Sequence, residues 1–154
     1  MHSRVYNIIS KGSELDDYLM EDYEMHEIYT DSMDWCDDNS KEMSKDLDWH
    51  FGERDRKFKK YYTITQDDID FFNNAIKSSV TYNMLRFITT VESVNDWLNS
   101  ADSTPKKPIS NYDLSNLFSS NVLIVVDGCR QNGSYQLSCL EPGMKVIQTF
   151  DYHN

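Results

Sequence analysis

Short runs of apolar residues near both ends of the chain predict β-strands. Between the predicted strands at residues 135–140 and 145–150, Glu141-Pro142-Gly143-Met144 fits a type II turn. Pro presets the first central dihedral angle of such a turn, and Gly accepts a positive φ at the second. We therefore expect residues 122–151 to form an antiparallel three-strand meander, with the N-terminal strand as a further candidate member of the sheet. Four stretches have the length or the alternation of strands: residues 5–9, 122–126, 135–140 and 145–150.

Apolar residues at helical spacing predict a helix early in the chain. Leu15, Leu19 and Tyr23 recur every four residues, which places them on one face of a helix over about residues 14–30. Residues 31–39 have two interpretations, a turn or a continuation of this helix.

Further helices are predicted along the chain, and Val91, Val94, Trp97 and Leu98 also lie at helical spacing. Thr65, with Asp68 three residues later, forms a capping pattern that opens one of them. Residues 80–88 favour a strand by propensity and a helix by their surroundings, and both interpretations stay open. The predicted elements are a helix over about residues 40–52, a helix from residue 65, and a short helix from residue 110 that follows a loop over residues 99–108.

Together these elements indicate a single α+β domain over residues 1–154. Its expected parts are an acidic helical segment (14–52), a helical middle (65–119) and the β-meander (122–151). The helices are expected to cover one face of the meander, because a bare sheet would leave an apolar face in water.

Charge is concentrated in one part of the chain. Of the 26 acids, 14 lie in residues 14–48, where there are only two bases, Lys41 and Lys45. The remainder of the chain is nearly neutral. A net charge of −11 argues that this chain neither binds the nucleic-acid backbone directly nor docks on an anionic membrane, because both surfaces are negatively charged.

The acidic stretch is not typical of a disordered tail, because large apolar and aromatic residues are interleaved with the acids. A folded face of this kind suits a basic surface on a partner protein, where charge would speed encounter and aromatic side chains would anchor the contact. The other interpretation is an inert, solvated face. The candidate binding residues are Asp16, Asp17, Glu21, Glu24, Asp34, Asp37 and Asp38 for charge, with Tyr23, Tyr29 and Trp35 as anchors.

A metal site is the main alternative for the same segment. Asp22 and His26 lie four residues apart, as do Asp46 and His50, with Glu42 one helical step earlier. Two such helix faces would allow a metal-dependent hydrolase. The segment is so acidic, however, that any histidine there has an acid at that spacing, and the Glu-x-x-His pattern of carboxylate-bridged metal bundles is missing. We therefore expect no cofactor, and a binding protein rather than an enzyme.

A basic stretch follows the acidic one. Residues 54–60 hold five cations next to aromatic residues, a mixture also found in modules that bind nucleic acids. The stretch is short, and we expect its cations to pair with the preceding acids or to dock a helix end.

Composition suggests a setting. The three cysteines, Cys36, Cys129 and Cys139, form no C-x-x-C pair, and residues 1–12 have no apolar core of signal-peptide length, so a cytoplasmic protein with free thiols is expected. Asn, Lys, Ile, Tyr and Phe are abundant, whereas there are only two alanines, as AT-rich codon use would produce. In composition the chain resembles the small acidic host-takeover and counter-defence proteins of tailed bacteriophages. The resemblance implies inhibition of a host nuclease, protease or defence complex, with mimicry of nucleic acid as one form. A structural or assembly subunit is the third hypothesis.

Overall fold

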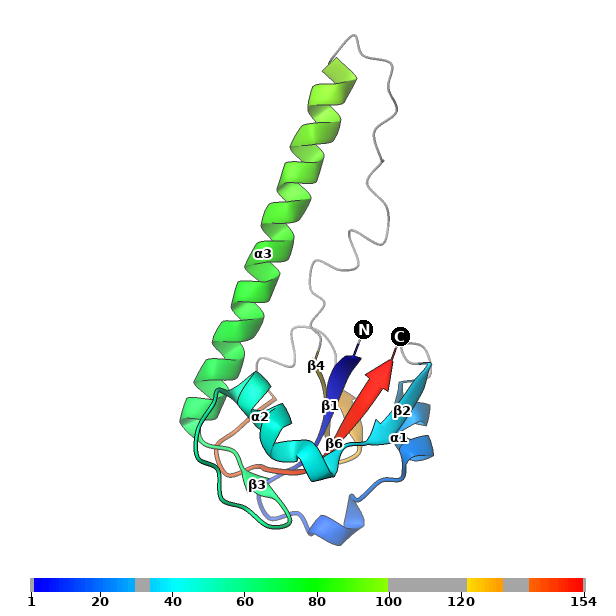
Figure 1. Ribbon diagram of the computed structural model, residues 1–154, viewed down its shortest axis with the longest axis vertical. Helices are drawn as coiled ribbons and strands as arrows, with labels where there is room; N and C mark the ends of the chain where they lie inside the picture. Colours follow the sequence, from blue (N-terminus) through cyan, green and yellow to red (C-terminus); the bar gives the residue numbers. More distant parts are fainter. Residues whose placement is uncertain (1, 30–33, 100–121, 132–138, 154) are drawn as a thin grey trace. The chain divides into compact units, whose positions relative to one another are not determined.

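The computed structural model describes residues 2–29, 34–99, 122–131 and 139–153 (Figure 1). Helices and a mixed sheet of six strands confirm the predicted α+β class. The chain divides into two compact units, one formed by residues 1–75 with 121–154 and the other by residues 76–120.

The sheet of the first unit is organised around the N-terminal strand. Strand β1 (His2–Ile9) runs parallel to β4 (Val122–Val126) and antiparallel to β6 (Lys145–His153). The strand order is β2-β6-β1-β4-β5, and β3 pairs with β6 outside this path (Figure 1). The N-terminal strand therefore joins the sheet at its centre.

The C-terminal strands consequently do not form a simple meander. β4 turns directly into β5 (Cys129–Gln131), but β1 lies between β4 and β6. Every residue of β1 from Val5 to Ile9 is buried, which suits a central strand covered on both faces. The predicted strand at residues 135–140 falls largely outside the described residues.

The predicted turn before β6 is confirmed. Gly143 has a φ of +95°, and the Met144 amide donates to the Glu141 carbonyl at 3.2 Å. This is the positive φ and the hydrogen bond that a type II turn requires.

The predicted helix over residues 14–30 is wrong. In its place are a 3-10 turn, η1 (Leu15–Asp17), and a short helix, α1 (Asp22–Ile28). The chain between them bonds to the sheet, because Gln148 accepts from the Met20 amide and donates to the Met20 carbonyl. Asn7 donates to the Tyr18 carbonyl. Backbone groups that a helix would use internally are therefore satisfied by side chains of β1 and β6.

Residues 35–38 form neither a turn nor a helix. They are strand β2 (Trp35–Asp38), which pairs antiparallel with β6 at one end of the strand order. Asp37 lies opposite Asp151 in this pairing. Charged side chains on a terminal strand discourage pairing with other chains.

The predicted helix over residues 40–52 is confirmed. A 3-10 turn, η2 (Ser40–Glu42), leads into α2 (Met43–Phe51), which ends at Gly52 with a φ of +85°. A two-residue strand, β3 (Tyr62–Thr63), follows and pairs with β6.

Helices cover both faces of the sheet. On one face, Met25 and Tyr29 of the α1 region pack in a cluster with Val5 and Phe150. On the other face, Tyr6 of β1 contacts Phe51 of α2, and the two ring centroids are 5.3 Å apart. The sheet is therefore the middle layer of the first unit.

Helix α3 (Gln66–Asn99) begins where the capping pattern predicts. Its first turns belong to the first unit, where Phe72 stacks on Phe51 at 5.2 Å. Residues 80–88 are helical, which resolves the ambiguity of that stretch. The predicted loop at residues 99–108 and helix from residue 110 lie outside the described residues, apart from Asn99. Within the described ranges, no helix combines the length and apolar character needed to span a bilayer.

Candidate protein-binding surface

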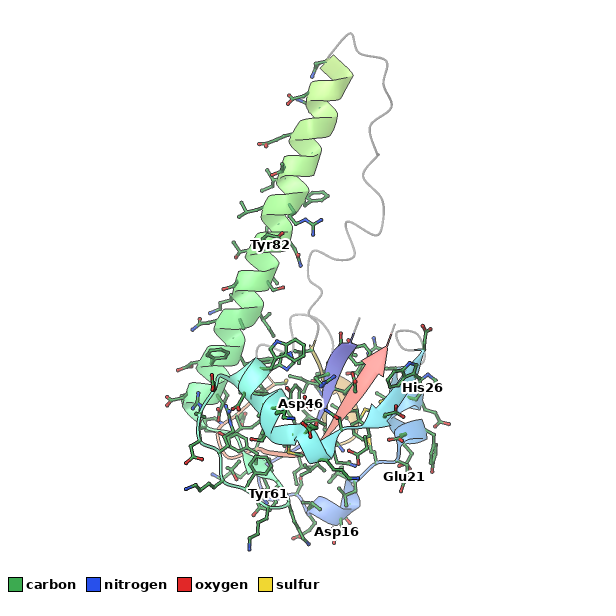
Figure 2. The ribbon with its side chains drawn as sticks, in the orientation of Figure 1. Asp16, Glu21, His26, Asp46, Tyr61 and Tyr82 are labelled. Carbon is green, nitrogen blue, oxygen red and sulfur yellow. The ribbon has the colours of Figure 1, made fainter. Side chains whose placement is uncertain are left out.

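The candidate acids lie at the surface of the first unit on three successive elements. Asp16 and Asp17 are on η1, Glu21 and Glu24 are at the start of α1, and Asp34, Asp37 and Asp38 are on or next to β2. All are exposed except Glu24, which is half-buried. Figure 2 shows Asp16 and Glu21 on the outside of this unit. We call these seven residues the acidic surface.

Three carboxylates in this region also shape the backbone. Asp22 accepts from the Asp38 amide at 2.7 Å, which links α1 to β2. Asp38 in turn accepts from the Ser40 amide at 2.7 Å, and Glu24 from the Glu21 amide at 2.8 Å. These acids hold the acidic surface in one shape, whereas Asp16, Asp17, Asp34 and Asp37 contribute exposed charge.

One of the three predicted aromatic anchors is wrong. Tyr23 is 63% exposed and Trp35 is 39% exposed, so part of each side chain faces solvent. Tyr29 is fully buried, and its hydroxyl donates to the Ile124 carbonyl at 3.1 Å. The Arg130 guanidinium lies 4.5 Å from the Tyr29 ring centroid. Tyr29 therefore belongs to the core that supports α1.

Two exposed apolar residues that lie close to the acids in the sequence were missing from the predicted site. Leu19 is 48% exposed, because residues 18–20 attach to the sheet through their backbone rather than through a helix face. Trp49 is 59% exposed and stacks on His50 with 4.9 Å between ring centroids. Its position directly after the acidic stretch was the signal that could have identified it.

Arg4, the first arginine of the chain, forms ion pairs within the first unit. Arg4 pairs with Asp46 at 2.7 Å and with Asp151 at 2.5 Å. Asp46 is 3% exposed and also accepts from Asn39 and Thr149. Figure 2 shows Asp46 between α2 and the sheet. This carboxylate joins β1, α2 and β6 and is not available as a metal ligand.

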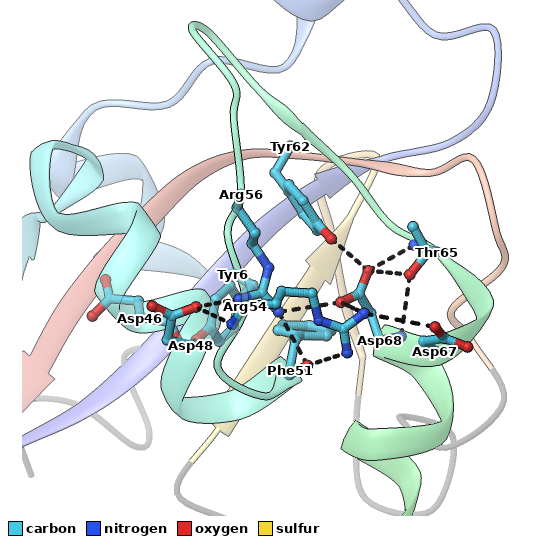
Figure 3. Close-up of polar contacts among 10 residues, drawn as sticks. All are labelled: Tyr6, Asp46, Asp48, Phe51, Arg54, Arg56, Tyr62, Thr65, Asp67 and Asp68. Carbon is cyan, nitrogen blue, oxygen red and sulfur yellow. Dashed lines mark hydrogen bonds and ion pairs between the residues drawn. The ribbon is translucent and has the colours of Figure 1, made fainter.

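A second buried network surrounds the start of α3 (Figure 3). Asp68 accepts from the Thr65 amide at 2.8 Å, the Thr65 hydroxyl at 2.6 Å and the Tyr62 hydroxyl at 2.7 Å. The Asp68 amide donates to the Thr65 hydroxyl, which completes the predicted reciprocal cap. Burial by itself would raise the pKa of Asp68, but the hydrogen bonds from Thr65, Tyr62 and Arg56 outweigh it and lower that pKa.

Two arginines of the basic stretch complete this network. Arg56 is 1% exposed; it donates to Asp68 at 3.2 Å and pairs with Asp48 of α2. Arg54 lies 3.5 Å from Asp68, and both arginines donate to the Phe51 carbonyl at the end of α2. The expectation that these cations pair with the preceding acids or dock a helix end is therefore confirmed for Arg56, which pairs with Asp48 and docks the end of α2. Arg54 also docks that helix end, but its acid partners, Asp67 and Asp68, follow it in the sequence.

The remaining cations of that stretch stay at the surface. Lys57, Lys59 and Lys60 are exposed, and Lys145 lies 4.9 Å from the ring centroid of the exposed Tyr61. An open hollow of about 560 Å³ is lined by residues 57–63. These lysines belong to a different loop from the acidic surface.

Asp22, Glu42, Asp46 and His50 each have a defined polar contact of another kind. Asp22 accepts from a backbone amide, Glu42 pairs with Lys45, and Asp46 binds Arg4. His50 Nδ1 lies 2.5 Å from the Tyr6 hydroxyl, and burial lowers the pKa of His50 to about 4. Among the described residues, no group of three or more His, Cys, Asp and Glu side chains is placed to hold a metal ion.

Tyr6 determines the proton position on His50. The Tyr6 hydroxyl donates its single hydrogen to the Asp46 carbonyl at 2.6 Å. In its contact with His50 it must therefore accept, which places the imidazole proton on Nδ1. His50 is thus a neutral imidazole that stacks against the Trp49 ring and has a structural role.

Comparison of the chain with protein-family models, with curated proteins and with solved structures finds no match. The function must therefore be argued from the residues and geometry of the chain itself.

Proposed function

We propose that this protein binds a basic surface of a partner protein through the acidic surface, with Tyr23, Trp35 and Trp49 as aromatic anchors. The observation that carries the proposal is the placement of the arginines. Arg4, Arg54 and Arg56 are drawn into internal networks with Asp46, Asp48 and Asp68. Within the described residues, the ion pairs of these three arginines do not include any acid of the acidic surface.

Exposed acids at this density lower the stability of the folded protein, which suggests that they are kept for a function. Like charges held close together repel and destabilise the folded state. Arg4, Arg54 and Arg56 could have relieved this repulsion, but they form ion pairs in the internal networks instead. A basic partner would remove the repulsion on binding, and its attraction would speed encounter.

The aromatic residues give the surface more than charge. Tyr and Trp are the side chains most often found at the energetic centre of protein interfaces. Tyr23 on α1 and Trp35 on β2 each stand among the acids, and the Asp22 hydrogen bond to the Asp38 amide links their two elements. The partner is therefore expected to combine cations with apolar contact sites.

The compositional resemblance to phage counter-defence proteins supports a specific version of this proposal. In this version the partner is a host nuclease, protease or defence complex in the cytoplasm, and its basic groove normally holds nucleic acid. An acidic mimic would then compete with duplex DNA for the same groove. A protein that bound elsewhere on the partner would leave DNA binding unchanged.

The test is affinity capture with a matched pair of variants. In the surface variant, Asp16, Asp17, Asp34 and Asp37 are changed to Asn, which removes four exposed acids without touching the carboxylates that hold the backbone. Each exposed charge contributes about 0.2–1 kcal/mol, so capture should weaken between about fourfold and several hundredfold.

The control variant changes four exposed acids elsewhere by the same total charge: Glu53→Gln, Asp55→Asn, Asp70→Asn and Glu141→Gln. It should capture the partner almost as the unmodified protein does. Mass spectrometry identifies the captured protein, and a salt series should release it. Equal loss in both variants would show general charge attraction, and no loss in the surface variant would refute the proposed site.

A further inference from the structure

Helix α3 carries an apolar stripe beyond the part that packs in the first unit. In residues 76–99, five large apolar side chains are between 40% and 60% exposed: Tyr82, Met84, Leu85, Ile88 and Val91. Single exposed apolar residues are ordinary, but Met84, Ile88 and Val91 recur at steps of four and three residues and so lie on one side of the helix, as expected for an interaction surface.

The spacing of the stripe specifies its kind of partner. Apolar residues recur in alternating steps of four and three along the sequence, at Val80, Met84, Phe87, Val91, Val94 and Leu98. This is the heptad repeat by which one helix packs along another in a coiled coil. Ile88 widens the stripe, as expected for a helix face that becomes buried.

From this pattern we propose that α3 associates with α3 of a second copy of this chain through the face containing Met84, Phe87 and Val91. Two identical helices match each other in heptad spacing along their whole length. The inference concerns a different unit of the chain from the acidic surface, and neither proposal depends on the other.

Charge also favours a second copy at this helix. The positions that flank a heptad seam set partner choice through their charges. Here they are Thr81, Asn83, Ile88, Thr90, Asn95 and Trp97, none of which is charged. Residues 76–99 contain two bases and two acids, so identical copies meet here without the repulsion that the acidic segment would cause.

The size of the face predicts a weak interaction. At about 1.5 Å per residue, residues 80–98 span about 27 Å. A heptad face of this length would bury on the order of 400 Å² per copy, about half of the ~800 Å² per partner of a standard interface. The association should therefore depend visibly on concentration.

Sedimentation velocity on the full chain tests the proposal over about 5 to 500 μM, the range that suits a weak interface. The unmodified protein should rise from the monomer mass towards the dimer mass. The variant Met84→Glu with Val91→Glu places like charges across the seam and should remain monomeric. The control Ser79→Glu with Thr89→Glu adds the same charge on the opposite side of the helix and should associate as before.

A mixing experiment shows whether the contact is direct. The variant Met84→Lys with Val91→Lys should also be monomeric alone, but mixing it with the glutamate variant should restore the dimer mass. Circular dichroism confirms that each variant keeps its helix content. A monomer at every concentration, association unchanged in the seam variants, or no recovery on mixing would overturn the proposal.

Discussion

The substitution Asp68→Asn tests the buried network of hydrogen bonds and ion pairs at the start of α3. The substitution keeps the size of the side chain but removes its charge and replaces one acceptor oxygen with a donor. Asp68 is fully buried and its carboxylate meets only donors, from Thr65, Tyr62, Arg54 and Arg56. Any placement of the amide therefore puts one N–H group against another donor.

The expected cost follows from the state of Arg56. Its guanidinium is 1% exposed, and after the change only Asp48 balances its charge. Removing one partner of a buried ion pair costs about 3–5 kcal/mol, out of a total stability of about 5–15 kcal/mol. At about 2–4 °C per kcal/mol for a chain of this size, the melting temperature should fall by roughly 6–20 °C.

Urea and thermal unfolding followed by circular dichroism measure this loss. Asp67→Asn is the matched control, because Asp67 lies in the same first turn of α3 but its side chain is 85% exposed. Both changes remove one negative charge from the helix N-terminus and one carboxylate near Arg54, which lies 4.0 Å from Asp67, so their difference isolates the buried contacts of Asp68 with Arg56, Tyr62 and Thr65. The control should cost less than about 1 kcal/mol.

A graded variant and pH give two further checks. Tyr62→Phe removes one donor to Asp68 and should cost about 1–2 kcal/mol, so it should remain folded if Asp68→Asn does not. Because the pKa of Asp68 is lowered in the folded state, its contribution is present at neutral pH and is lost as the pH falls through that pKa. Equal stability of Asp68→Asn and Asp67→Asn at pH 7 would refute this account of the network.

Three other outcomes are expected. His50 protonates near pH 4 when folded but near pH 6.5 when unfolded, so the free energy of unfolding should fall by on the order of 3 kcal/mol as the pH drops from 7 to 4; His50→Gln should remove this difference in a urea series. Cys36 is buried with its pKa raised to about 12, whereas Cys129 is exposed, so a maleimide should label Cys129 quickly and Cys36 only on unfolding, as peptide mass mapping would show. Gly52→Ala should destabilise the protein by about 1–3 kcal/mol in thermal unfolding, because φ is +85° and an added Cβ would lie 3.0 Å from the Phe71 ring.

Features that depend on neighbouring residues were predictable from the sequence. Strands near both ends, the cap at Thr65 and the turn at Gly143 all follow from local periodicity or from the dihedral angles that single residues allow. The location of the excess charge in residues 14–48 was also visible, because it requires only counting.

Features that depend on distant residues were not predictable. The helix predicted over residues 14–30 breaks because Asn7 and Gln148, far away in the sequence, bind the backbone of residues 18–20. Residues 35–38 become a strand because β6 offers them an edge. Local propensity carries no information about either partner.

The candidate site divides in the same way. The sequence by itself determined the α+β class, most of the element positions and the segment that holds the acids. Only the tertiary structure decided that Tyr29 is core, that Tyr23, Trp35 and Trp49 are exposed, and that β1 enters the centre of the sheet. It also decided that Arg4 and Arg56 neutralise Asp46, Asp48 and Asp68 rather than the exposed acids. The physical reason is that burial and ion pairing depend on which strands and helices pack together. These contacts bring together residues that are far apart in the sequence.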